Sequence, residues 1–136
     1  TNLKISEKNI LFGQYSFGQG IANYYVGFVG QQLDAVYDPG QAKMTLKAIR
    51  GGFLTYTCIF NPSWRFSVTG GTSTITEKNF EPHDTFESSK YFASNVFYNP
   101  IETIRLGFEV TTGSRTNLDM QKGNSTRISL LANFDF

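Results

Sequence analysis

The stretch TRISLLANFDF, residues 126–136, alternates polar and apolar side chains with a period of two. Its even positions are apolar from residue 128 onward: Ile128, Leu130, Ala132, Phe134 and Phe136. Its odd positions are polar except for Leu131. Because successive side chains of a β-strand point to opposite sides of the sheet, this pattern predicts a terminal strand with one apolar and one polar face.

The same alternation recurs upstream. It predicts further strands at residues 8–17, 22–29, 53–60, 64–69, 90–98 and 104–111. The seven strands are mostly longer than the usual soluble strand of about five or six residues. They approach the about 9–11 residues with which a tilted strand crosses a membrane. The sequence therefore predicts an all-β, antiparallel fold.

The connections between these strands alternate in length. Tight turns are predicted at 18–20, 61–63 and 99–102, and longer polar loops at 32–43, 76–88 and 116–125. Short periplasmic turns and longer external loops are typical of transmembrane β-barrels of the outer membrane. Aromatic residues near the tight turns predict a girdle at one membrane interface. They are Phe17, Tyr24, Phe60, Trp64, Phe97, Tyr98, Phe134 and Phe136.

Composition excludes several function classes. Twelve basic residues face eleven acidic ones, which argues against a broad nucleic-acid surface. Cys58 is the single cysteine and His83 the single histidine, so neither a disulfide framework nor a multi-histidine zinc site can form within the chain. We expect no metal, no cofactor, no catalytic residue and no enzyme activity.

Alternation alone does not say which face meets lipid. A soluble barrel turns its apolar face inward, whereas a membrane barrel turns it outward. Small polar residues with scattered Arg and Glu on the other face, and the low density of charge (17%), favour the membrane barrel. The residues expected to face lipid are Leu54, Phe66, Val68, Leu106, Phe108 and Leu130. A soluble secreted barrel that binds an apolar ligand is the alternative.

Strand parity predicts that the chain is the C-terminal part of a larger barrel. The last strand of such a barrel runs toward the periplasm, so seven strands place Thr1 outside, whereas a complete bacterial barrel has an even strand number. We treat residues 1–136 as a single barrel segment. If residues 2–6 form an eighth strand, which needs a tight turn at Glu7-Lys8, a small complete membrane barrel with a structural role is the other alternative.

Charged residues on the polar face are candidates to line a pore. They are Arg65, Arg105, Glu109, Arg115 and Arg127. Four arginines against one glutamate predict a basic wall that favours anionic solutes. The competing interpretation is a ladder of cross-strand ion pairs among Arg105, Glu109 and Arg127 that stiffens the wall.

The last 45 or so residues resemble the C-terminal end of DcaP-like outer-membrane porins and related trimeric porins. The resemblance rests on Asn99-Pro100, Gly107-Phe108-Glu109, Gly113-Ser114-Arg115, Arg127 and the closing Phe134-Asp135-Phe136. It implies a bacterial outer-membrane location, a homotrimer, and a water-filled channel for small hydrophilic solutes. The alternating positions Ile128, Leu130, Phe134 and Phe136 resemble the signal that the outer-membrane assembly machinery reads.

Overall fold

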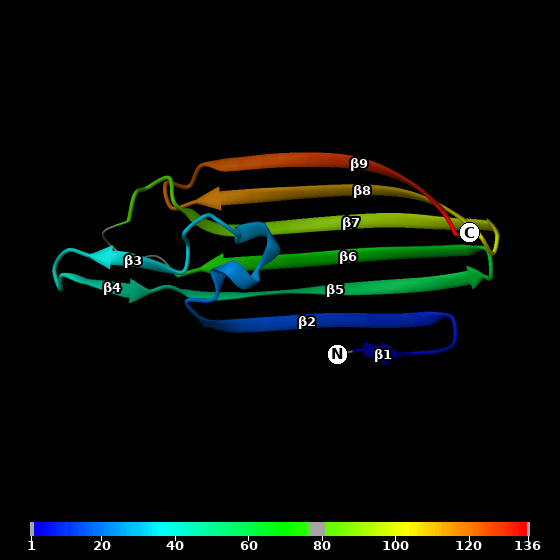
Figure 1. Ribbon diagram of the computed structural model, residues 1–136, viewed down its shortest axis with the longest axis horizontal. Coiled ribbons are helices and arrows are strands. Elements are labelled where there is room, and N and C mark those ends of the chain that lie inside the picture. Colours follow the sequence, from blue (N-terminus) through cyan, green and yellow to red (C-terminus); the bar gives the residue numbers. More distant parts are fainter. Residues whose placement is uncertain (1, 77–80, 136) are drawn as a thin grey trace.

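A computed structural model describes residues 2–76 and 81–135. Seven strands form one antiparallel sheet in the order β1-β2-β5-β6-β7-β8-β9 (Figure 1). Their bounds are β1 Asn2–Lys4, β2 Asn9–Gln19, β5 Ala48–Asn61, β6 Trp64–Ile75, β7 Phe86–Ile101, β8 Ile104–Asn117 and β9 Lys122–Phe134. The predicted all-β antiparallel fold is confirmed. No helix among the described residues is long and apolar enough to span a membrane.

The connection between β2 and β5 holds the remaining elements. Two 3-10 turns, η1 (Ala22–Tyr24) and η2 (Val26–Phe28), are followed by a hairpin of β3 (Ala35–Asp38) and β4 (Lys43–Leu46). In Figure 1 the two turns lie in front of the sheet, and the hairpin extends beyond its left-hand end. We call residues 20–47 the inner loop.

The predicted alternation of short and long connections holds only in part, because the connection at 118–121 has four residues, as many as the turn at 5–8. Two-residue turns at 62–63 and 102–103 and the turn at 5–8 lie at the end of the sheet where the chain also finishes (Figure 1). The inner loop, Thr76, residues 81–85 and residues 118–121 lie at the other end. Asn61 Oδ1 accepts hydrogen bonds from the amides of Ser63 (2.9 Å) and Trp64 (3.0 Å), which closes one of the tight turns.

The prediction of a strand at 22–29 is wrong. Within residues 22–28, apolar and aromatic side chains recur at every second position, a pattern that predicts a strand. They also recur at every third position, at Ala22, Tyr25 and Phe28. In a 3-10 helix, side chains three apart lie on one side, and this side is turned toward the sheet. The spacing of three therefore decides the local structure.

Two related predictions change with it. Residues 18–20 are the end of β2 and the start of the inner loop, so they form no tight turn, and β2 runs toward the long loops instead of away from them. The seventh strand of the sheet is β1, which pairs with β2 through the 5–8 turn. The turn is longer than the Glu7-Lys8 pair expected for it. Thr1 lies outside the described residues.

The other predicted boundaries shift outward. Strand β7 continues through Asn99 and Pro100, with an irregular register between Tyr98 and Ile101, and the turn falls at Glu102-Thr103. The loop predicted at 116–125 shortens to 118–121 because β8 and β9 keep pairing up to Thr116 and Lys122. The strands thus extend beyond the central stretches in which apolar and polar residues alternate clearly.

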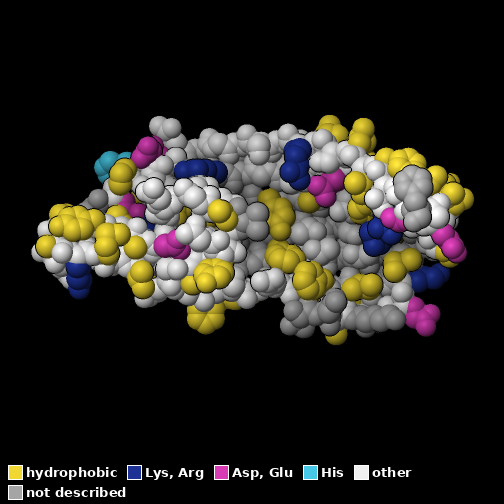
Figure 2. Space-filling view, viewed as in Figure 1, with side chains coloured by type: hydrophobic (Ala, Val, Ile, Leu, Met, Phe, Trp, Pro, Cys, Tyr) yellow, Lys and Arg dark blue, Asp and Glu magenta, His cyan; other side chains and the backbone are white. Residues whose placement is uncertain are grey.

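Cross-strand register gives the sheet two chemically different faces. Residues directly paired across neighbouring strands lie on the same face. One row reads Thr57, Ser67, Asn95, Glu109 and Ser129, and the next reads Cys58, Phe66, Val96, Phe108 and Leu130. We call the face of the first row the polar face and that of the second row the apolar face. Figure 2 views the molecule from the side of the inner loop, which lies on the polar face.

The register places every residue expected to face lipid on the apolar face. This set is Leu54, Phe66, Val68, Leu106, Phe108 and Leu130. Leu130 is 82% exposed and Leu54 is 54% exposed, so this face packs against nothing within the described chain. That lipid covers the face stays a prediction.

The predicted aromatic girdle is partly wrong. Trp64 and Tyr98 stack with ring centroids 4.4 Å apart at the tight-turn end, and Phe60 and Phe134 lie at the same end. Phe17 is at the opposite end of the sheet and Tyr24 is in η1, because residues 18–20 form no tight turn. Phe97 lies on the polar face, paired with Arg65 and Gly107, and Phe136 lies outside the described residues.

The two faces predict opposite effects for adjacent substitutions. Leu130→Arg places a charge near the middle of the apolar face and is expected to cost about 2–4 kcal/mol of the free energy of unfolding. Ser129→Arg, one residue away on the polar face, is expected to be tolerated. Urea unfolding of the full protein from phospholipid vesicles measures both, and equal penalties would contradict the assignment of the faces.

Candidate functional site

The polar face is lined by hydroxyl groups that satisfy one another across the strands. Thr55 and Thr69 hydroxyls lie 2.8 Å apart, Thr57 and Ser67 hydroxyls 2.9 Å apart, and those of Ser73 and Ser89 2.8 Å apart. These three pairs bring hydroxyl groups of β5, β6 and β7 to this face and satisfy them without charged partners. Such a surface is readily wetted by water.

The inner loop folds back onto this face. The Tyr25 hydroxyl lies 2.7 Å from Ser16 Oγ and donates to the Ser16 carbonyl at 2.9 Å. Gly20, with a φ of +64°, makes the turn that leads the chain back, and its amide donates to the carbonyl of Lys47 (3.0 Å). The loop is therefore fixed at both its start and its return.

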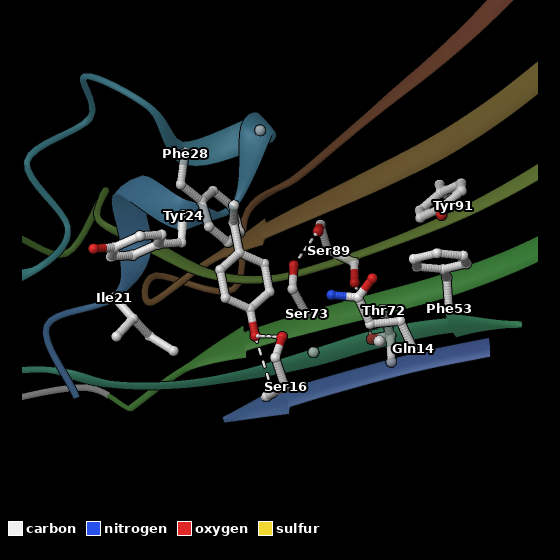
Figure 3. A pocket seen from close by; sticks show the side chains of 14 residues that line it. Gln14, Ser16, Ile21, Tyr24, Phe28, Phe53, Thr72, Ser73, Ser89 and Tyr91 are labelled. Atoms are coloured by element: carbon white, nitrogen blue, oxygen red, sulfur yellow. Dashed lines mark hydrogen bonds between the residues drawn. The ribbon is translucent and has the colours of Figure 1, made fainter. Parts of the chain in front are cut away.

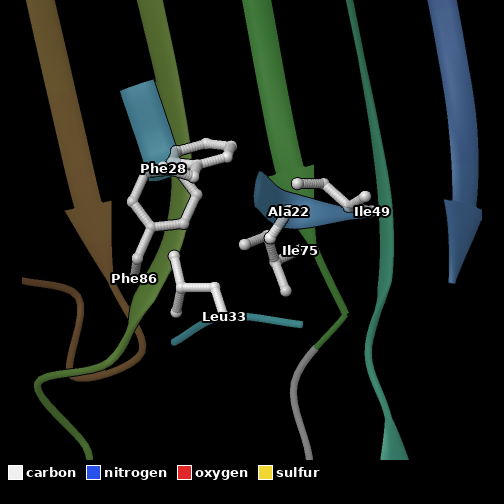
Figure 4. Close-up of a cluster of buried hydrophobic side chains, with 6 residues drawn as sticks. All are labelled: Ala22, Phe28, Leu33, Ile49, Ile75 and Phe86. Atoms are coloured by element: carbon white, nitrogen blue, oxygen red, sulfur yellow. The ribbon is translucent and has the colours of Figure 1, made fainter. Parts of the chain in front are cut away.

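A hydrophobic cluster holds the loop against the sheet (Figure 4). Its loop members are Ala22, Phe28 and Leu33, and its sheet members are Ile49, Ile75 and Phe86. Phe28 and Phe86 approach with ring centroids 4.6 Å apart. Since these side chains are 8% exposed or less, the cluster stabilises the folded-back loop through ordinary burial of apolar surface.

A glycine on the sheet makes the close approach of the loop possible. A Cβ at Gly51 would lie 3.0 Å from Tyr25 Cε1 and 2.9 Å from the carbonyl oxygen of Thr72. The Gly51-Gly52 and Gly70-Gly71 pairs lie in regular register between β5 and β6. At Gly51 the missing side chain is what lets the Tyr25 ring lie on the strand.

A buried ion pair joins the inner loop to the loop after β6. Lys47 Nζ contacts Glu81 Oε1, and the two side chains are 2% and 3% exposed. The Lys47 amide also donates to the carbonyl of Asp34 (2.9 Å). Because two charges are removed from water here, each depends on the other for compensation.

Between the inner loop and the sheet lies an open cavity of about 940 Å³ (Figure 3). Its walls combine aromatic rings with hydroxyl and amide groups, and none of the described residues that line it is charged. They include Gln14, Tyr24, Tyr25, Phe28, Phe53, Ser73, Ser89 and Tyr91. The loop thus leaves a hollow of molecular size on the polar face.

All five predicted pore-lining residues lie on the polar face, but they differ in the groups that surround them. Arg127 Nη2 donates to Glu109 Oε1 at 3.3 Å, and Asn95 and Thr111 also donate to this carboxylate (3.4 and 3.2 Å). Arg105 joins no ion pair among the described residues, so the expected ladder reduces to a single pair.

The other two predicted pore-lining arginines, Arg65 and Arg115, pack on aromatic rings. The Arg65 guanidinium carbon lies 4.7 Å from the centre of the Phe97 ring, and that of Arg115 lies 5.4 Å from the centre of the Phe86 ring. Arg115 Nε also donates to Asn117 Oδ1 at 2.8 Å. Arg65 and Arg105 line one small hollow of about 180 Å³ near the tight turns.

The inner loop is a part of the site that the sequence pattern does not indicate. Tyr25, Phe28, Lys47 and Glu81 have no place among the predicted site residues, because 22–29 reads as a strand and the two charges lie in separate polar stretches. The spacing of three in Ala22, Tyr25 and Phe28 is the signal for the 3-10 turns. For the Lys47–Glu81 pair the sequence offers no signal.

The expected assembly signal lies on the edge strand. Ile128 is 67% exposed and Phe134 is 54% exposed, and both lie with Leu130 on the apolar face of β9. Phe136 lies outside the described residues. That assembly machinery reads these positions stays a prediction.

Comparisons with known proteins give one family and one solved structure. The family model of the DcaP outer membrane protein matches residues 1–136. The crystal structure of the outer membrane channel DcaP of Acinetobacter baumannii is similar, with a TM-score of 0.84 and 18% sequence identity. The match covers 99% of this chain and 38% of that one, so the chain spans less than half the length of the solved structure. No curated protein matches. The resemblance seen in the last 45 residues is thus confirmed, and it extends over the whole chain.

The Lys47–Glu81 pair generates a prediction about the inner loop. Lys47→Met leaves the Glu81 carboxylate buried opposite an apolar side chain, and loss of one partner of a buried pair costs about 3–5 kcal/mol. We expect the inner loop to detach and become susceptible to proteases at its hairpin in the full protein. Lys43→Met, an exposed lysine of the same hairpin, is the control. Equal protease resistance of the Lys47 variant and the parent protein would contradict a role of the pair in holding the loop.

Proposed function

The chain belongs to the DcaP outer membrane protein family, and we propose that it forms part of the wall of a porin-type channel for passive diffusion of small hydrophilic solutes. It is a protein of the outer membrane, so the alternative of a soluble secreted barrel is set aside. The observation that carries the proposal is the inner loop packed onto the polar face of the sheet.

The chemistry of the two faces supports a lumen on the side of the polar face. The apolar face suits hydrocarbon, and the hydroxyl-lined polar face suits a water-filled lumen. A folded-back loop on the polar face narrows the lumen without blocking it, because the about 940 Å³ cavity remains open beside it. Solutes of modest size then pass between the loop and the facing wall.

The charges on the polar face support a preference for anions. Glu109 and Arg127 neutralise each other, whereas Arg65, Arg105 and Arg115 form no ion pair among the described residues. Their positive potential extends into the lumen and lowers the energy of an anion there. The aromatic rings below Arg65 and Arg115 hold the guanidinium groups in place without cancelling their charge.

The assembly state is also a proposal. We infer a homotrimer from the resemblance to trimeric porins, with insertion guided by Ile128, Leu130, Phe134 and Phe136 of the terminal strand. The exposed apolar residues of β9 are consistent with a strand that is recognised before the barrel is complete. Gel filtration with light scattering of the full protein in detergent tests the trimer directly.

Ion selectivity tests the function. Removal of Arg65 and Arg105 as the double variant R65Q/R105Q is expected to lower the anion-to-cation permeability ratio of the full protein about five-fold, because the lost charges raise the energy of an anion and lower that of a cation by the same amount. The estimate uses about 0.5 kcal/mol per charge at about 8 Å in water, halved by screening at about 0.1 M salt. The ratio follows from the reversal potential across a planar bilayer under a salt gradient.

A charge-neutral control accompanies this measurement. The double variant E109Q/R127Q removes one positive and one negative charge from the same face, so the selectivity is expected to stay that of the parent protein. Absence of any conductance in the parent protein would contradict the channel, and an unchanged ratio in R65Q/R105Q would contradict the basic wall.

A further inference from the structure

The apolar face changes character at its long-loop end. Two neighbouring rows there carry hydroxyl, amide and basic side chains in place of apolar ones. One row contains Arg50, Thr74, Ser88, Thr116 and Lys122, and the next contains Thr72, Lys90, Ser114 and Asn124. We call these nine residues the basic belt. The basic residues among them have no role in the proposed channel function, since they lie on the side of the sheet opposite the inner loop, whereas Thr72 also lines the cavity beside that loop.

The belt carries three cations and no carboxylate. Arg50, Lys90 and Lys122 are exposed. None of them forms an ion pair within the part of the chain that the structure describes, and this includes Glu87, the nearest acid along β7. The positive charges are therefore left without a counter-charge from the described protein.

The position of the belt along the strands matches a membrane surface. On β8, eight residue steps separate Ile104 from Thr112, which corresponds to about 27 Å at about 3.4 Å per residue. A strand tilt of about 40° reduces this to about 21 Å along the membrane normal, near the about 25 Å apolar band of such barrels. Ser114, in the row of Lys90, is the next residue outward on this face. The belt thus begins where hydrocarbon ends.

Aromatic residues mark the same level. Phe17 pairs with Arg50, and Tyr15 lies in the row of Lys90 through Gly52 and Thr72. Both rings are well exposed, at 78% and 67%. Exposed aromatic side chains with a polar neighbourhood are typical of the interface between hydrocarbon and headgroups.

We propose that the basic belt binds the phosphate groups of lipid headgroups in the leaflet on the long-loop side. Lys90 lies two strands and one row away from both Arg50 and Lys122, a separation of about 12 Å. The three cations thus form a broad triangle that takes phosphates at two or more points. Arginine offers a fork to phosphate oxygens and lysine a compact charge, and the hydroxyls between them donate further hydrogen bonds.

The charge pattern favours lipid over a second copy of the chain. A symmetric contact between two copies through this face would bring the three cations against those of the partner. The described rows of the apolar face supply no carboxylate to compensate them. Phosphate-bearing lipid supplies the missing negative charge at the right depth.

Binding of a defined glycolipid to the full protein tests the proposal. The probe is diphosphorylated lipid A, titrated into the detergent-solubilised protein and followed by native mass spectrometry, with the dephosphorylated glycolipid in parallel. Loss of three surface cations in R50Q/K90Q/K122Q is expected to weaken the dissociation constant for the diphosphorylated form at least about tenfold. The dephosphorylated form is expected to bind weakly to the parent and the variant alike.

Matched variants separate the possible outcomes. R65Q/R105Q/R115Q removes the same number of positive charges from the polar face and is expected to bind lipid as the parent does. R50K/K90R/K122R keeps the three charges of the belt and is also expected to bind lipid as the parent does. The single variant K90Q serves if the triple variant folds poorly, with a smaller loss expected. The proposal is overturned if R50Q/K90Q/K122Q binds lipid as the parent does, or if both glutamine triple variants lose binding equally. It is also overturned if the parent binds both glycolipids equally, or if the belt variant changes the oligomeric state and not lipid binding. Because lipid binding is read without conductance, its failure leaves the channel function untouched.

Discussion

Hydrocarbon offers the peptide backbone no hydrogen-bond partner, so a chain that crosses it with strands must pair every strand with a neighbour. From β2 to β9 the ladders meet this condition over long continuous registers, and β5 pairs with β6 from Ile49 to Asn61 with one irregularity near the turn. The side chains then have no freedom of direction, because the pleat sends them alternately to either face. The division into a polar and an apolar face follows from backbone pairing. The inner loop and the candidate pore-lining charges lie on the polar face, and the basic belt lies on the opposite one.

The inner loop depends on the same pairing. The regular pairing near the start of β5 and the absence of a side chain at Gly51 let Tyr25 approach closely, and Ile49, Ile75 and Phe86 at the strand ends supply an apolar patch beside it. The loop is held there by burial and by the Lys47–Glu81 pair, and both fix its position over the lumen side. The basic belt on the opposite face lies at the same end of the strands, so the two proposals place the narrowing of the passage and the contact with headgroups at one end.

The sequence alone predicts the strands well and the loop badly, for a physical reason. In β8 and β9 apolar and polar side chains alternate every second residue, and the regular register sends them to opposite faces, so the facing of Leu106, Glu109 and Leu130 follows from the sequence. Residues 22–28 bury one side against a sheet that is distant in sequence, and Ala22, Tyr25 and Phe28 satisfy two periods at once. Only the position of the sheet decides between them. The Lys47–Glu81 pair joins segments 34 residues apart, which no local pattern encodes.

Accessibility along β9 tests the central claim that one face meets lipid and the other water. In the full protein with Cys58→Ala, single cysteines at Arg127, Ser129, Leu131 and at Ile128, Leu130, Ala132 are labelled in vesicles by a charged, water-soluble maleimide. The account predicts fast labelling at the odd positions and slow labelling at the even ones. Uniform labelling, or the reverse alternation, would contradict it.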